Sequence, residues 1–144
     1  MEQRLHRIEI VTHGRALIGI TDQICGWVRP QGIVTGVLTI WCRHTLASLL
    51  VQENASPDVR ADLETFLARL VPDGGASHYR HAEEEPDDMP AHIRAALTPS
   101  QLSIPVAGGL PVLGTWHGIY LYEHRTNPHQ RELVLHLTGE PSPT

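Results

Sequence analysis

The segment I-V-T-G-V-L-T-I-W at residues 33–41, followed by L-A-S-L-L-V-Q at residues 46–52, decides the fold class. Both runs are rich in branched apolar side chains, which favour extended strands. A short polar stretch, Cys42-Arg43-His44-Thr45, separates them. The pattern therefore predicts two neighbouring strands that pair as an antiparallel hairpin.

The clearest helix follows these two strands. Ser56 suits the N-cap, Pro57 the first helical position, and Asp58 the first turn, where its charge complements the helix dipole. Apolar residues then recur at helical spacing and form a single stripe: Val59, Leu63, Phe66, Leu67 and Leu70. We expect a core helix that ends near Val71.

The remaining segments complete an α+β pattern. Thr21 or Asp22 is placed to cap a short helix over residues 23–28, and a second main helix is expected over residues 90–97. We expect a compact single domain over residues 1–140, mainly antiparallel sheets with two helices, and a loose tail over residues 141–144. Further strands are expected at residues 4–12, 101–105, 116–123 and 132–137.

Composition excludes several classes of protein. No apolar run is long enough for a bilayer span or a signal peptide, so we expect a cytoplasmic protein without a membrane partner. The net charge of -5, with 11 Lys and Arg residues, gives no reason to expect nucleic-acid binding. Cys25 and Cys42 lack C-x-x-C spacing and are expected to be small core residues. The glycine-rich phosphate loops, G-x-S-x-G and H-E-x-x-H are also missing, which argues against the large nucleotide-binding and hydrolase folds.

The loop H-Y-R-H-A-E-E-E-P-D-D-M-P-A-H, at residues 78–92, carries three histidines and five carboxylates. Imidazole and carboxylate are ligands for divalent cations and act as acids or bases near neutral pH. His81 and His92 are eleven residues apart, which fits no single helical face, so they meet only if the loop folds back. The alternative interpretation is a solvated acidic loop.

Two further parts of this candidate site remain open. Asp87 and Asp88 precede the helix at residues 90–97, so one could cap it and the other could complete a metal shell; Asp88 is our choice for the site. Residues 83–85 are expected to be solvated glutamates. His44 lies where one strand passes to the next, a position that holds a metal ligand rigidly. Alternatively, its imidazole bonds a turn carbonyl.

The last long strand supplies candidates at both of its ends. In a regular strand, His117 and Glu123 lie about 20 Å apart at ~3.3 Å per residue, so they cannot bind the same ion. Arg125 suits a phosphate because its planar fork binds two oxygens, although Glu123 and Arg125 could instead form a structural ion pair. Trp116 is either a pocket wall or a core residue, and Asn54 is a candidate hydrogen-bond donor to the same pocket.

Four motifs in order resemble the YjbQ-like family, which is described as having a secondary thiamine-phosphate synthase activity. They are H-T-L-A-S at residues 44–48, Q-E-N-A-S-P-D-V-R-A-D-L at 52–63, D-D-M-P-A-H-I at 87–93 and L-G-T-W-H-G-I-Y-L-Y-E-H-R at 113–125. The resemblance covers most of the chain. It implies a compact α+β fold, a homotrimer with clefts near the subunit boundaries, and a histidine-rich pocket suited to a metal ion. Leu46 and His117 stand where family members commonly have serine and glutamine, which bears on specificity.

Two functions follow from different classes. The first is a metal-assisted enzyme for a small phosphorylated compound, and the resemblance suggests that it joins a pyrimidine pyrophosphate to a thiazole phosphate. The second is a non-catalytic trimeric protein that binds a metal ion or a small anion. Zinc, manganese or nickel would suit mixed nitrogen and oxygen ligands. The candidate residues are His44, His81 and His92 for the metal, Asp88, Glu123 and Arg125 for catalysis, and Asn54, Trp116 and His117 for ligand binding.

Overall fold

Two antiparallel sheets and three α-helices make up the computed structural model, which describes residues 1–76 and 78–142. The larger sheet has the order β1 (Glu2–Thr12), β8 (His129–Glu140), β3 (Thr35–Cys42), β5 (Gln101–Ala107) and β6 (Leu110–Pro111). The smaller sheet has the order β2 (Ala16–Gly19), β7 (His117–Glu123) and β4 (Ala47–Glu53). The helices are α1 (Thr21–Val28), which continues as a 3-10 turn over Arg29–Gln31, α2 (Pro57–Leu70) and α3 (Asp88–Leu97).

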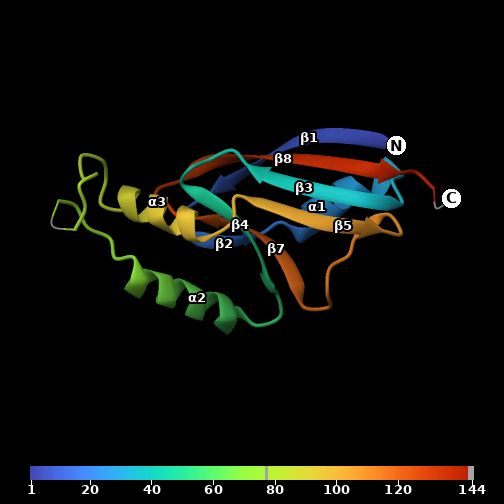
Figure 1. Ribbon diagram of the computed structural model, residues 1–144. Coiled ribbons are helices and arrows are strands. Elements are labelled where there is room, and N and C mark those ends of the chain that lie inside the picture. The colour runs from blue at the N-terminus through green and yellow to red at the C-terminus, as the bar shows by residue number, and fades with distance from the viewer. Residues whose placement is uncertain (77, 143–144) are drawn as a thin grey trace.

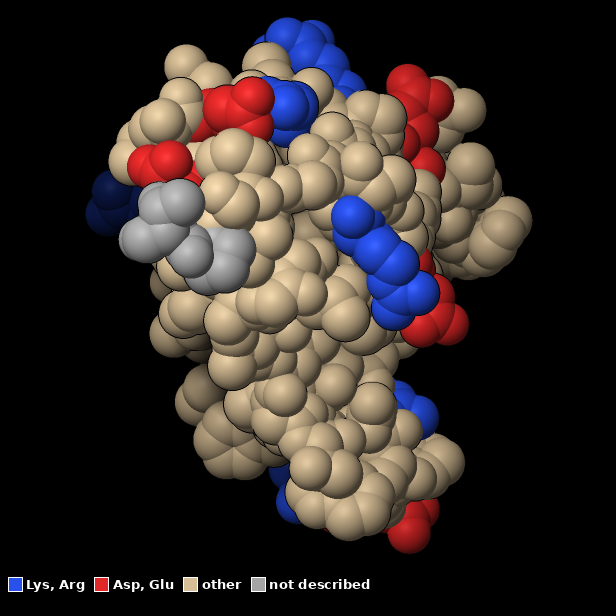
Figure 2. All heavy atoms as spheres, turned by 90° about the vertical axis from the view of Figure 1, so that its right-hand side faces the viewer, with Lys and Arg blue, Asp and Glu red and all other residues tan. Residues whose placement is uncertain are grey.

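The elements lie in layers that place the histidine-rich loop at one end of the molecule. In Figure 1 the larger sheet forms the upper layer, the smaller sheet lies beneath it, and α2 runs below the smaller sheet. The connection from α2 to α3 projects at the end opposite to the two termini. Figure 2 shows the terminal end, where the charged side chains are scattered over a largely uncharged surface. None of the helices that the structure describes could cross a membrane, because each is too short or too polar.

The core lies where the two sheets and α1 meet. Leu133, Leu135 and Leu137 alternate along β8 and are fully buried, and Ile119 and Leu121 of β7 are buried with them in one apolar cluster. Each such side chain contributes roughly 1.5–3 kcal/mol by leaving water. Cys42 joins this core as expected, whereas Cys25 is only partly buried. Of the expected loose tail, residues 143 and 144 lie outside the described residues.

The predicted hairpin between the first two strong strands is wrong. β3 pairs with β8 and β5 in the larger sheet, whereas β4 pairs with β7 in the smaller one. The polar link between them carries the chain from one sheet to the other. Ala47, Ser48 and Leu49 are buried in succession, as in a strand that is covered on both faces.

The prediction that α2 is a core helix is also wrong. No residue of α2 is fully buried, and Phe66 and Leu70 of the apolar stripe are 61% and 57% exposed. Ser56 and Pro57 begin the helix as expected, but the Ser56 side chain makes no capping hydrogen bond. The caps proposed for α1 are likewise not used, because Thr21 Oγ1 accepts the Ile119 N–H instead.

A pair of glycines allows β3 and β8 to approach closely. Gly36 and Gly139 are direct partners, and a Cβ at Gly36 would lie 2.1 Å from the Thr138 carbonyl oxygen. Gly36→Ala is therefore expected to lower the free energy of unfolding by about 1–3 kcal/mol, measured by urea denaturation. The control is Gly26→Ala on the exposed surface of α1, where nothing lies within 4 Å of the new Cβ. That change should stabilise by about 0.5–1 kcal/mol, and equal effects at both positions would contradict the close-approach argument.

Candidate metal centre

The acidic loop folds back, so that His81, Asp88 and His92 come together as a single group. One ligand atom from each residue lies within 4.8 Å of the other two. Asp88 Oδ2 is 2.7 Å from His81 Nε2 and 3.5 Å from His92 Nε2. The expectation that the two histidines meet across the loop is confirmed, because their ring centres are 5.5 Å apart.

The start of α3 explains how this group is positioned. Asp88 and His92 are four residues apart, so they lie on one face of α3, one turn apart. His81 approaches from the preceding loop. The carboxylate of Asp88 is favourably placed at the N-terminus of the helix, where the helix dipole stabilises negative charge.

This donor set suits a divalent metal ion with an open coordination position. Two imidazoles and one carboxylate are a combination found in zinc sites where water or substrate takes the fourth place. Zinc ligands at ~2.0–2.1 Å in a tetrahedron lie about 3.3 Å from one another. The spacing of His92 and Asp88 already fits, and His81 would need to withdraw by about half an ångström from its 2.7 Å contact. The Asp88 side chain is only 8% exposed, whereas both imidazoles face solvent in part.

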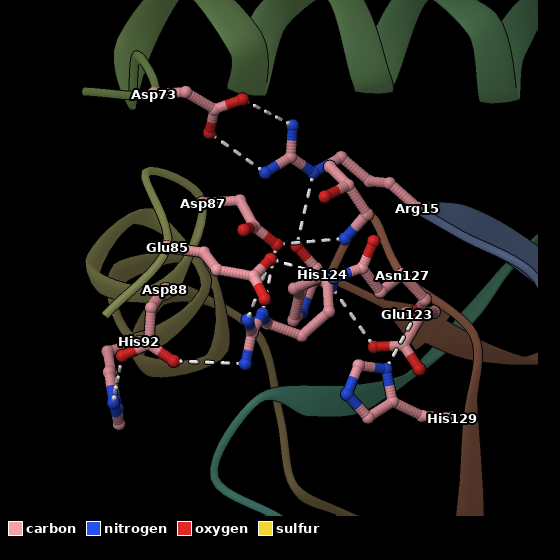
Figure 3. A network of polar contacts seen from close by, with 12 residues as sticks. Arg15, Asp73, Glu85, Asp87, Asp88, His92, Glu123, His124, Asn127 and His129 are labelled. Atoms are coloured by element: carbon pink, nitrogen blue, oxygen red, sulfur yellow. Dashed lines mark hydrogen bonds and ion pairs between the residues drawn. The ribbon is translucent and has the colours of Figure 1, made fainter. Parts of the chain in front are cut away.

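Arg125 holds carboxylates and does not present its fork to a phosphate, which corrects the expected role. Its Nε donates to Asp87 Oδ2 at 2.9 Å and its Nη1 to Asp88 Oδ1 at 3.0 Å, and its side chain is 12% exposed. Burial alone would lower the pKa of Arg125, but the hydrogen bonds and charges of these carboxylates raise it. Figure 3 shows the result, with Asp88 placed beside His92. Arg125 therefore orients Asp88 so that its second oxygen faces the imidazoles.

The choice between the two aspartates falls on Asp88. Asp87 occupies the N-cap position of α3, but its side chain does not cap the helix. It accepts hydrogen bonds from Arg125 and from the Thr126 N–H. Burial alone would raise the pKa of Asp87, but these bonds hold it below its usual value. Asp87 is thus a neighbour of the group and not a member of it.

Glu123 is a buried structural residue, which corrects its expected catalytic role. Its carboxylate is fully buried and accepts hydrogen bonds of 2.7 Å from both Nε and Nη2 of Arg131. Thr12 Oγ1 and the Arg125 backbone N–H also donate to it. Burial alone would raise the pKa of Glu123, but the bonds from Arg131 and Thr12 lower it below its usual range. No side of this carboxylate remains for a substrate, and its ion-pair partner is Arg131, not Arg125.

His44 lies beside the group but outside it. Its Nε2 accepts the Glu132 backbone N–H at 2.7 Å, so it bonds neither the metal group nor a turn carbonyl through this atom. Burial, followed by the charge of Arg131, lowers the pKa of His44. His44 and His92 both line a pocket of about 550 Å³. Its other walls are Trp41, Cys42, Arg43, Thr45, Ala47, Ala95, Ala96 and Ser100.

The three predicted ligand-binding residues gather at the opposite end of β7. Asn54 donates from its backbone to the Trp116 carbonyl at 2.8 Å and from Nδ2 to the His117 carbonyl at 3.2 Å. His117 Nδ1 accepts the Gly114 N–H. All three side chains are exposed, so Trp116 is not a core residue. His117 begins β7 and Glu123 ends it, so the two lie about 20 Å apart at ~3.3 Å per residue. Arg125, which bonds Asp88, follows Glu123, so the cluster around His117 lies apart from the metal group.

Sequence reasoning did not anticipate a layer of buried polar residues beneath α3. Arg94 and His124 are fully buried, and Ser48 lies against His124 with 2.8 Å between Oγ and Nε2. Burial, assisted by the charge of Arg94, lowers the pKa of His124 to about 3. The sequence did contain one signal for this layer. Arg94 follows Ala91 by three residues, so both lie on the same, buried side of α3.

Comparison with known families identifies the chain. A family model described as UPF0047 protein YjbQ-like matches residues 6–140. This chain belongs to the YjbQ-like family. A UPF0047 protein from Synechocystis is 50% identical over 131 residues, which cover 91% of this chain and 88% of that protein. The UPF0047 protein YjbQ from Escherichia coli O157:H7 is 41% identical over 84% of this chain and 87% of its own length.

Solved structures of YjbQ-like proteins share the fold. An uncharacterised YjbQ/UPF0047 family protein from Clostridium acetobutylicum is 31% identical, covers 92% of this chain and 99% of its own, and has a TM-score of 0.83. A YbjQ-like protein of unknown function from Sulfolobus solfataricus has a TM-score of 0.84 at 22% identity, over 96% of this chain and all of its own, and supports the fold alone. The predicted family and α+β class are confirmed.

The two departures from the YjbQ-like pattern are not members of the metal group. Leu46 precedes β4 and is partly buried, and His117 is exposed at the other end of the smaller sheet. Neither contributes a ligand atom to the group of His81, Asp88 and His92. The departures therefore leave the donor set of the candidate metal centre unchanged.

Proposed function

We propose that this YjbQ-like protein binds a divalent metal ion through His81, Asp88 and His92 and uses it on a small phosphorylated compound. The convergence of two imidazoles and one carboxylate within 4.8 Å is the observation that carries this proposal. His92 belongs both to that group and to the wall of the large pocket. An ion held there would neutralise phosphate charge at the edge of the pocket.

The pocket has features that suit such a compound. Its volume of about 550 Å³ falls within the usual range for small-molecule sites. Trp41 offers an aromatic surface, while Arg43 supplies a positive charge that its single 3.1 Å bond to Glu132 leaves partly free. His44 accepts a hydrogen bond at Nε2, so its proton resides on Nδ1 and can be donated to a substrate oxygen.

The family resemblance suggests a specific reaction for this site. It is the joining of a pyrimidine pyrophosphate to a thiazole phosphate, with departure of pyrophosphate. Within this proposal Arg125 keeps Asp88 oriented toward the imidazoles, and His44 and Arg43 bind phosphate oxygens. The homotrimer implied by the same resemblance stays a prediction.

A non-catalytic metal-binding protein is the second candidate. The observation that favours it is the position of His81 on the connection between α2 and α3, whereas Asp88 and His92 are on α3. An ion shared by these residues would fasten the loop to the helix. In that case metal would raise thermal stability without supporting any turnover.

The deciding measurement combines metal content with turnover. Untagged protein purified without chelator is expected to contain near one divalent ion per chain by elemental analysis. Pyrophosphate release from the two phosphorylated substrates is then measured before chelation, after chelation and after the ion is restored. Turnover that follows the metal supports the enzyme, and bound metal with a raised melting temperature but no turnover supports the binding protein. Protein that takes up no zinc, manganese or nickel would reject both.

A further inference from the structure

Arg94 is the largest fully buried side chain among the described residues, and most of its guanidinium is unpaired. Its Nη1 donates to Glu64 Oε1 at 2.7 Å. Its Nε and Nη2 are buried and have no hydrogen-bond partner within the described part of the chain. These two nitrogens form one edge of the planar guanidinium, and their N–H groups point the same way. That edge can bind a single oxygen from two sides.

His124 Nδ1 is the third buried side-chain atom without a partner in residues 1–76 and 78–142. The His124 ring is fully buried at the end of β7 and packs 4.5 Å from the Tyr122 ring. Tyr122 donates its hydroxyl to Glu64 Oε1 at 2.9 Å, on the same oxygen that pairs with Arg94. A chain of contacts therefore leads from Arg94 through Glu64 and Tyr122 to His124.

A second chain of contacts closes the ring from the other side. His124 Nε2 lies 2.8 Å from Ser48 Oγ, and Ser48 Oγ lies 2.6 Å from Thr98 Oγ1. Thr98 Oγ1 is in turn 2.7 Å from the Arg94 carbonyl oxygen. The Arg94 guanidinium and the His124 imidazole thus lie within one ring of contacts, and the charge of Arg94 acts directly on His124.

Counting hydrogens decides which atoms in this ring donate. Thr98 has one hydroxyl hydrogen, and the Arg94 carbonyl can only accept, so that hydrogen goes to the carbonyl. Ser48 must then donate to Thr98, and His124 must donate from Nε2 to Ser48. His124 Nδ1 is left with a lone pair. The three unpaired atoms are therefore two donors and one acceptor.

We propose that one enclosed water molecule accepts hydrogen bonds from Nε and Nη2 of Arg94 and donates one to Nδ1 of His124. Three hydrogen bonds are typical of a buried water, and such waters occupy sites where buried polar groups lack protein partners. The water completes a closed hydrogen-bonded layer between α3 and the smaller sheet.

Charge balance selects water over an anion as the ligand. The charged groups that act on His124 are already paired, and His124 itself is neutral because burial and the Arg94 charge lower its pKa to about 3. A buried anion would add a charge without a counter-charge, which is strongly unfavourable. The existing pairs are Arg94 with Glu64, Arg131 with Glu123, and Arg15 with Asp73; Figure 3 shows the last of them.

The enclosed layer also positions the candidate metal ligands. Arg94 lies two residues beyond His92 on α3, and Thr98 ends the same helix. Anchoring this helix through Arg94 fixes where Asp88, which is also buried, and the partly exposed His92 project from it. Arg94 is therefore a positioning residue for the metal group, a role that rests on the proposed function.

An atomic-resolution crystal structure tests the water directly. Density is expected within hydrogen-bonding distance of all three nitrogens. Crystals soaked in sodium bromide test for an anion, because bromide scatters anomalously. Anomalous density at Arg94, or a direct protein contact in place of the water, overturns the proposal. This result does not depend on whether the protein binds metal, so the water and the proposed function can fail separately.

Variants test the positioning role. Arg94→Met is expected to weaken zinc binding about tenfold and to shift the nitrogen NMR resonance of His124 Nδ1. Arg69→Met, at an exposed position on α2, is the matched control and should change neither. If Arg94→Met does not fold, Thr98→Val breaks the ring at one hydroxyl and should cause a smaller change in both quantities. A folded variant with unchanged zinc affinity and an unchanged His124 resonance overturns the role.

Discussion

Replacing Arg131 with methionine is expected to lower the free energy of unfolding by about 3–5 kcal/mol, because the change leaves the Glu123 carboxylate buried without a counter-charge. Both nitrogens that Arg131 presents lie 2.7 Å from Glu123, and Glu123 is fully buried. The measurement is a urea or guanidinium titration at pH 7. Arg4→Met is the control, since its pair with Glu2 is exposed and should be worth less than about 1 kcal/mol.

A double variant separates the buried charge from lost packing. Glu123→Leu combined with Arg131→Met removes both charges, so much of the stability should return. If Arg131→Met alone costs no more than Arg4→Met, the carboxylate reaches solvent and the buried pair is not the reason for the stability. If the double variant is no better than Arg131→Met, the loss comes from packing.

The same pair fixes the direction of the pH dependence. The pKa of Glu123 is lower in the folded protein than its ordinary value, so folding favours the ionised form. Its contribution is complete above about pH 4.3, the usual glutamate pKa, and is lost as the pH falls through the folded-state pKa. Arg131→Met should therefore remove part of the acid sensitivity of the wild-type protein.

Local patterns predicted the elements, but they could not predict which strands pair. The helical spacing of apolar residues, together with Pro57 and Pro90 near the helix starts, located both main helices to within about two residues. The partner of β4 is β7, which lies about seventy residues later in the chain, so the polar link after Cys42 could not show that a sheet change occurs there. The apolar stripe of α2 likewise indicates a helix face, but not that Phe66 and Leu70 on this face remain exposed while Glu64 accepts hydrogen bonds from its neighbours.

The candidate site shows the same division between chemistry and geometry. His81, Asp88 and His92 could be selected because few residue types bind metal, and the fold-back of the loop brings them together. The role of Arg125 could not be selected, since its fork binds carboxylate as well as it binds phosphate. The fork of Arg125 binds carboxylate because Asp87 and Asp88, adjacent in sequence, are both oriented toward it.

Asp88→Asn is expected to weaken zinc binding by about 100-fold or more, beyond the roughly 10–100-fold effect of losing a neighbour of a metal ligand. The substitution keeps the shape of the side chain but removes the charge that lies between the two imidazoles. Zinc affinity is measured by competition with a chromophoric chelator at fixed pH, because imidazole ligands must be neutral to bind.

Asp87→Asn is the matched control for this change. Asp87 and Asp88 are adjacent at the start of α3, and both accept a hydrogen bond from Arg125, but only Asp88 faces the imidazoles. The Asp87 variant should therefore weaken zinc binding by about tenfold, through the loosened Arg125, while the Asp88 variant loses a ligand outright. Equal losses in the two variants would mean that both aspartates act only through Arg125, and the zinc would then have to bind to the histidines without a carboxylate.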